Sequence, residues 1–297
     1  MPSGYYEIQK YTQLIGFPEE AIAFFQDMEK RVSRDTKLTA SIDKHIDQFM
    51  VPGTEFSVFR ELSTQLTTLL SVSSYSVDMF LLLAALPNLT VRYTENSLSQ
   101  ELFQDTMTDL RYKLFECKST YDEWGNFVAF WYPGFYQVQR FALGRFQYER
   151  DTFAEESFTQ NGLLLQKGDP VINFHIPTCG PMPRDLRLSS YEKAYRFFGT
   201  ERPDGYLPFV CHSWLLFQGH REFLTPDANI VSFMEDFTIL RQEPQEKFHD
   251  AWRVFGSQSK KPMSEWPSES SLQKGYLRLL QSGGKSAWGY GVFFYKP

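Results

Sequence analysis

The stretch VINFHIPTCGPMPRDLRLSSYEKAYRFF, Val171–Phe198, decides the fold of the second half of the chain. Side chains alternate along its first part, a predicted strand. Val171, Asn173 and His175 share one face, and the other face is apolar, with Ile172, Phe174 and Ile176. A loop containing proline, glycine and two arginines follows, and Ser189 and Ser190 then open an amphipathic helix that ends at Gly199. The pattern predicts a strand, loop and helix connection whose free backbone N–H groups favour an anion.

A second strand, read in LPFVCHSWLLF over residues 207–217, carries polar residues inside an apolar run. A strand buried on both faces normally reads as an unbroken apolar run, so Cys211 and His212 indicate a satisfied polar network or a cleft between separating strands. The helix between the two strands makes them expected parallel neighbours. Their carboxyl ends would then bound one crevice, the position at which open α/β sheets bind ligands.

The candidate anion site in this crevice combines five residues of the connection. Gly180 lies in the loop, and the backbone N–H groups at Ser189 and Ser190 are predicted to point into the crevice from the start of the helix. Arg184 and Arg187 add charge-assisted contacts to a phosphate.

The first part of the chain predicts a helical domain. Residues 18–32 place Ile22, Phe25, Met28 and Val32 at helical spacing, and comparable stripes follow over residues 54–69, 76–86 and 97–114. The helical pattern stops near Asp122. We therefore predict an all-helical N-terminal domain over residues 1–122 and a mixed α/β sheet domain over residues 123–297, an α+β protein.

Composition restricts the function classes. A formal charge of −6 without a long basic run disfavours nucleic acid and an anionic membrane surface as partners. Three widely spaced cysteines indicate neither a disulfide framework nor a zinc ribbon, and no metal cofactor is expected. The N-terminus lacks the order of a signal peptide, and the longest apolar run, residues 77–86, is too short to cross a bilayer. We expect a cytoplasmic protein, and the sequence does not indicate an oligomeric state.

Three segments carry a family resemblance: LGRFQYE, GDPVINFHIP and FVCHSWLL, within residues 143–216. They resemble a bacterial acyltransferase family with a helical N-terminal domain and a GNAT-like C-terminal domain. The resemblance implies that acyl-CoA is the co-substrate, with its pyrophosphate on the loop and helix start after Pro177. It also implies that a small-molecule or peptide amine attacks the thioester directly, forming an N-acyl product.

Within this frame His175 and His212 are the predicted general base or substrate-orienting groups, because an imidazole titrates near neutrality. A buried, hydrogen-bonded core histidine is the alternative for each. Cys211 is a candidate acyl-carrying nucleophile. However, adjacent residues of a strand face opposite ways, so Cys211 and His212 cannot pair simply, and a buried inert thiol is the favoured interpretation of Cys211.

Two other function classes stay open. The usual GNAT phosphate signature, Gln or Arg followed by Gly-x-Gly or Gly-x-Ala, is absent, and the loop offers only Gly180. This departure favours, as an alternative, a non-catalytic binding or interaction protein on a degenerate GNAT-like scaffold. A metal enzyme using His175, Cys179, Cys211 and His212 is a weaker alternative, since no second closely spaced ligand pair faces the first.

Overall fold

A computed structural model describes residues 5–297 and divides the chain into two compact units, Met1–Ala142 and Leu143–Pro297. The boundary lies further along the chain than the predicted one near Asp122. Asp122 does end a helix, in the left-handed conformation. The aromatic segment that follows nevertheless packs back into the first unit, because the Tyr132 hydroxyl donates to Asp109 at 2.7 Å and the Tyr136 hydroxyl donates to the Leu82 carbonyl at 2.6 Å.

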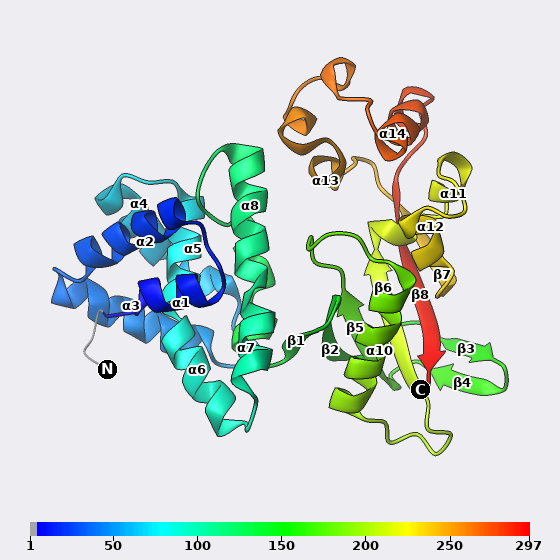
Figure 1. The fold of residues 1–297 in the computed structure, drawn as a ribbon, viewed down its shortest axis with the longest axis horizontal. Coiled ribbons are helices and arrows are strands. Elements are labelled where there is room, and N and C mark those ends of the chain that lie inside the picture. Colours follow the sequence, from blue (N-terminus) through cyan, green and yellow to red (C-terminus); the bar gives the residue numbers. More distant parts are fainter. Residues whose placement is uncertain (1–4) are drawn as a thin grey trace. The chain divides into compact units, whose positions relative to one another are not determined.

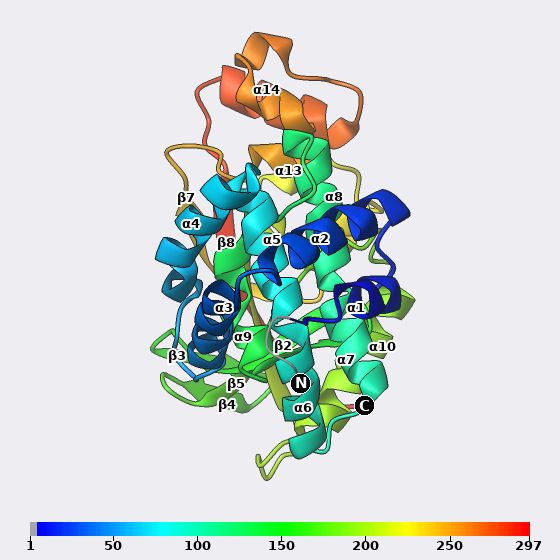
Figure 2. The same cartoon turned by 90° about the vertical axis from the view of Figure 1, so that its left-hand side faces the viewer.

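The first unit consists of helices, as predicted. They are α1 (Ile8–Leu14), α2 (Glu19–Val32), α3 (Thr36–Phe49), α4 (Arg60–Leu70), α5 (Ser74–Ala84), α6 (Leu86–Glu95), α7 (Gln100–Met107), α8 (Asp109–Tyr121) and α9 (Pro133–Tyr136). Helix α5 is apolar nearly all round and contacts α1, α3, α4, α6 and α8, which places it at the centre of this unit (Figure 2). The side chain of Ser73 caps α5, and that of Ser99 caps α7.

One stretch of the described residues, Ser74–Glu95, is long and apolar enough to cross a membrane by length and composition. It comprises α5 and α6, and 67% of its most apolar window is buried inside the protein. A central helix of a globular unit accounts for these properties.

A six-stranded sheet has the order β1-β2-β5-β6-β8-β7 (Figure 1); its first strand, β1, spans the boundary between the units, and the other five belong to the second unit. Its strands are β1 (Arg140–Leu143), β2 (Phe146–Thr152), β5 (Pro170–His175), β6 (Leu207–Ser213), β7 (Thr238–Pro244) and β8 (Ala287–Tyr295), and a separate hairpin pairs β3 (Ser157–Gln160) with β4 (Leu163–Gln166). The helices are α10 (Arg184–Phe198), α11 (His220–Phe223), α12 (Asn229–Met234), α13 (Ala251–Phe255) and α14 (Ser271–Gln281). The helical unit followed by this mixed sheet confirms the predicted α+β class.

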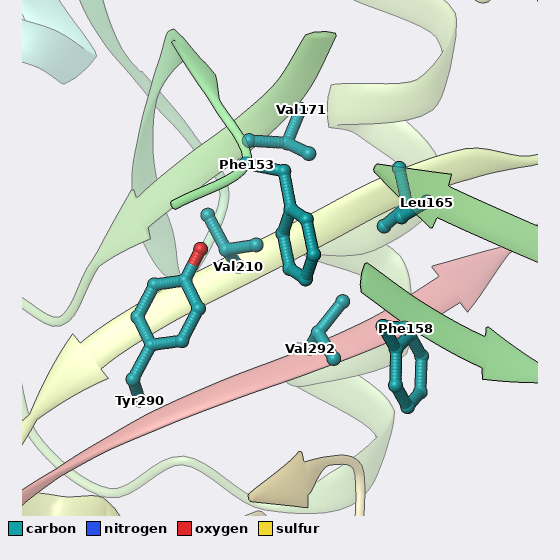
Figure 3. Packing of buried hydrophobic residues seen from close by; sticks show 7 residues of the cluster. All are labelled: Phe153, Phe158, Leu165, Val171, Val210, Tyr290 and Val292. Carbon is teal, nitrogen blue, oxygen red and sulfur yellow. The ribbon is translucent and has the colours of Figure 1, made fainter. Parts of the chain in front are cut away.

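The two faces of the sheet have different cores. On the α10 face, the Phe174 ring lies 5.8 Å from the Tyr191 ring of α10 and 6.1 Å from the Phe233 ring of α12, measured between centroids. On the opposite face, a cluster under the β3–β4 hairpin fills the apolar part of the sheet (Figure 3); it contains Phe153, Phe158, Leu165, Val171, Val210, Tyr290 and Val292. This second face is the one that carries His175 and His212 further along the strands.

Beyond the carboxyl ends of β6 and β7 the chain forms a smaller aromatic cap. The segment after β6 and the helices α13 and α14, which connect β7 to β8, pack on one another around Tyr276 (Figure 1). His220 is fully buried there, and its Nε2 atom lies 2.8 Å from the Tyr276 hydroxyl. The cap thus adjoins the sheet edge at which β5 and β6 end.

Candidate functional site

The parallel strands β5 and β6 are bridged over only part of their length. Their register pairs Ile172 with Phe209 and Asn173 with Val210, and the pairing stops there although both strands continue. The strands are therefore not bridged throughout, as a cleft between them requires. Counting on from the last pair, His175 and His212 fall at the same level and on the same face, so the two histidines flank this unbridged end, the opening between the strands.

His175 is held by a carboxylate of the adjacent strand. Its Nε2 atom lies 2.7 Å from the Oε1 atom of Glu149 on β2, and both side chains are largely buried, at 17% and 20% exposed. Glu149 is the register partner of Asn173, one pleat back on the same face. A carboxylate on Nε2 fixes the ring orientation of the imidazole and stabilises its protonated form.

His212 has a similar but more open partner. Its Nε2 atom lies 3.1 Å from the Oε2 atom of Glu243 on β7, and the two side chains are 36% and 39% exposed. Arg241 pairs with the other oxygen of Glu243, and the indole of Trp288 lies edge-on to the imidazole with its centroid 5.0 Å away. The opening is therefore flanked by two histidine–glutamate pairs on one face of the sheet.

The helix after the loop begins earlier than predicted. Helix α10 starts at Arg184 and not at Ser189, with Pro183 as its N-cap, and the Arg187 N–H already donates to the Pro183 carbonyl. The N–H groups of Ser189 and Ser190 therefore lie inside the helix, where the helical ladder uses them. The helix N–H groups without an intrahelical partner are those of the first turn, beginning at Arg184.

Of the five predicted anion-site residues, two lie at the loop and helix start in exposed positions. Gly180 adopts φ +103°, which only glycine adopts without strain, and Arg184 is exposed at the first helical position. Ser189 is exposed but lies about one turn further along α10.

Ser190 and Arg187 are turned inward and do not face a ligand. The Ser190 hydroxyl donates to the Leu143 carbonyl at 2.6 Å and accepts the Phe146 N–H at 3.1 Å. Arg187 is 1% exposed, and its Nε and Nη2 atoms donate to the two carboxylate oxygens of Asp236 at 2.7 and 3.2 Å. Both residues attach α10 to the rest of the unit, which corrects their prediction as phosphate ligands.

Cys211 lies on the α10 face of β6, opposite in direction to His212. The thiol is buried, and burial raises its pKa well above the ordinary value of a cysteine. A thiol that does not ionise is a poor nucleophile, so the geometry agrees with the inert interpretation of Cys211. Within residues 5–297 no three histidine, cysteine or carboxylate side chains come together as a metal-binding group, and this includes the set around His175 and Cys179.

Sequence reasoning missed the residues that hold the site together. Glu149 and Glu243 come from strands whose neighbours cannot be read from the sequence, and Asp236 meets Arg187 from the turn between α12 and β7. Arg145, in the turn before β2, donates to three carbonyls of the loop after β5. The only signal in the sequence was the LGR tripeptide before β2, which is typical of a tight turn but does not reveal its partner.

Comparisons with known proteins agree with this architecture. The model of the N-acyltransferase N-terminal domain matches residues 7–138, and that of the GNAT-like C-terminal domain matches residues 141–293. A search of curated protein sequences found no significant match.

Among solved structures, an acyltransferase in complex with decanoyl-CoA and teicoplanin is similar with a TM-score of 0.77 and 18% identity, over 98% of this chain and 88% of that one. An acyltransferase in complex with decanoyl-CoA has a TM-score of 0.73 and 20% identity, over 97% and 87% of the two chains. A third, in complex with CoA and 10C-teicoplanin, has a TM-score of 0.75 and 18% identity, over 96% and 87%. These likenesses establish the shared fold. The chain belongs to the family of acyltransferase-fold proteins in which an N-acyltransferase N-terminal domain precedes a GNAT-like C-terminal domain.

Proposed function

We propose that the protein is an N-acyltransferase that moves an acyl group from acyl-CoA to a small-molecule or peptide amine. The observation that carries the proposal is the end of the bridging between β5 and β6 at Asn173 and Val210, with His175 and His212 level with one another just beyond. The names of the structural neighbours, which are complexes with acyl-CoA or CoA, support the choice of donor.

The chemistry requires a neutral amine and a polarised thioester. To polarise the thioester, its oxygen would accept a backbone N–H of β5 beyond the last paired residues, where β5 is not bridged to β6. An amine bound on the histidine face would attack the carbonyl carbon and lose a proton, the C–S bond would break, and CoA would leave as the thiol after taking up a proton.

We assign the general base to His175 and substrate orientation to His212. The carboxylate of Glu149 lies closer to His175 than that of Glu243 lies to His212, and the first pair is the more buried. A base held in one orientation and largely screened from water accepts a proton at a defined position. His212, more exposed and beside Trp288, is suited to contacting the acceptor.

The test is a thiol-release assay with acetyl-, octanoyl- and decanoyl-CoA against a panel of amines. His175→Gln is expected to lower kcat by about 10² to 10⁴-fold and to remove the acidic limb of the pH profile. His212→Gln is expected to raise KM for the amine with a smaller change in kcat. A larger loss of kcat in His212→Gln would reverse the two roles. Binding of CoA without turnover of any acyl-CoA would favour the non-catalytic alternative.

A further inference from the structure

The loop after β5 is shaped by one arginine of a different hairpin. The guanidinium of Arg145 donates from Nη1 to the Pro177 carbonyl at 3.0 Å, from Nη2 to the Gly180 carbonyl at 2.7 Å and from Nε to the Pro181 carbonyl at 3.0 Å. Arg145 is only 9% exposed. All three nitrogens of the guanidinium are therefore used on a single loop of five residues.

The position of Arg145 is itself fixed by α10. Gly144 turns the chain with φ +79°, and a Cβ atom at this residue would lie 3.4 Å from Ser190. The Ser190 hydroxyl bonds the carbonyl of Leu143 and the N–H of Phe146, on either side of Arg145. The turn is thus pinned to the helix whose first turn follows the loop, and the arginine cannot move independently of the loop that it holds.

The hydrogen bonds of Arg145 decide the direction of the loop amides. In a trans peptide the C=O of one residue and the N–H of the next point in opposite directions, and the described chain has no cis peptide bond. With the Pro177 and Pro181 carbonyls directed at the guanidinium, the N–H groups of Thr178 and Met182 are directed away from it. The loop then presents amide donors on the side opposite a buried cation, an arrangement that suits an anion.

We propose that Arg145 is a positioning residue for the donor diphosphate, taking over the task that the glycine-rich signature performs where it is present. This inference rests on the proposed function. Arg145 does not touch the donor in this scheme; it holds residues 177–181 in the shape that receives it. A loop with two prolines and Gly180 lacks the run of adjacent amides of a glycine-rich loop, so an external donor of hydrogen bonds is needed to order it.

The experiment compares two donors that share the acyl thioester, only one of which carries the nucleotide and its diphosphate. Acyl-CoA carries the diphosphate, and the acyl thioester of N-acetylcysteamine does not. For Arg145→Ala, KM for acyl-CoA is expected to rise at least tenfold, while kcat with acyl-CoA and kcat/KM with the short thioester change by less than about twofold. Arg145→Lys, which keeps the charge and part of the hydrogen bonding, is expected to lie between Arg145→Ala and the native protein.

Arg150→Ala is the matched control, because Arg150 lies exposed on the same hairpin and donates to the Phe198 carbonyl, away from the loop. It is expected to behave as the native protein with both donors. Equal losses with both donors in Arg145→Ala and Arg145→Lys, or no loss with either, would overturn the inference. Failure of the native protein to use or bind any acyl-CoA would instead overturn the proposed function, and the inference with it.

Discussion

The buried ion pair between Arg187 and Asp236 gives the sharpest stability prediction. Arg187 donates to both carboxylate oxygens of Asp236, to the Met182 carbonyl at 2.9 Å and to the Ser232 carbonyl at 3.0 Å. The Asp236 side chain is 16% exposed and also accepts the Tyr191 hydroxyl at 2.8 Å. Arg187→Met keeps an unbranched apolar stem and removes every one of the donors of the side chain.

The expected loss in Arg187→Met is about 3–5 kcal/mol of unfolding free energy, because the variant leaves a mostly buried carboxylate without its cation. Asp236 keeps the hydroxyl of Tyr191, which places the expectation at the lower end of that range. Replacing both charges, in Arg187→Met with Asp236→Leu, removes the uncompensated charge. The double variant is therefore expected to be more stable than Arg187→Met alone, although it carries one more substitution.

Urea denaturation followed by tryptophan fluorescence, on the native protein, the two single variants and the double variant, measures these differences. Because the chain has two units, the transition of the second unit must be resolved separately or fitted with its own midpoint. A loss below about 1 kcal/mol in Arg187→Met, or single losses that simply add in the double variant, would refute the account of Arg187 as a structural clamp.

Three further outcomes are expected. Burial lowers the pKa of His220 to about 4, so between pH 6.5 and pH 4 the unfolded chain binds a proton at His220 that the folded chain does not bind. The free energy of unfolding of the second unit, measured by urea titration, should therefore fall by about 3 kcal/mol between pH 7 and pH 4. The fall should be smaller in His220→Gln. Burial raises the pKa of Asp78 to about 6, although the Ser63 hydroxyl lies 3.0 Å from the carboxyl group. The protonated Asp78 therefore favours the folded state at low pH, and this contribution to stability is lost as the pH rises from about 4 to above 6. Asp78→Asn should stabilise the first unit by about 1–2 kcal/mol at pH 8 and not at pH 4, and the opposite trend in thermal melts would contradict this. Cys211→Ala should retain turnover in the thiol-release assay, because the buried thiol does not ionise, and an inactive but folded variant would restore Cys211 as nucleophile.

Much of the fold could be predicted because it depends on periodicity along the chain. The stripe in residues 18–32 became α2, the alternation in Val171–His175 became part of β5, and the helix between the strands made β5 and β6 parallel neighbours. Helix starts were less predictable. Ser189 and Ser190 have good N-cap character, yet α10 begins five residues earlier, because Arg187 is satisfied inside the protein by Asp236 and Ser190 by the turn before β2.

Site residues could be predicted from the sequence where a polar residue interrupts an apolar run. Residues that matter only because they contact such a residue from another strand could not be predicted. His175 and His212 stand out as polar residues in apolar runs, and both lie at the opening between the strands. Their carboxylates do not stand out, since an acidic residue on a strand is ordinary until its neighbours are known. Strand order across a sheet, β2 beside β5 and β7 beyond β8, is set by tertiary packing and leaves no trace in local sequence.

The histidines of β5 and β6 lie just beyond the level at which the bridging between the two strands ends. Val171, Ile172 and residues 207–209 have buried side chains, and the backbones of the two strands pair at Ile172 with Phe209 and at Asn173 with Val210. His175 and His212 come after pairing has ended, where burial is incomplete on the histidine face. A polar side chain inside a fully paired, covered strand would carry a desolvation cost, whereas at this level each imidazole keeps a carboxylate partner and partial contact with solvent. The polar residues that interrupt the apolar runs therefore lie just beyond the level at which the bridging between β5 and β6 ends, and there the two imidazoles stay partly exposed, as the proposed function requires.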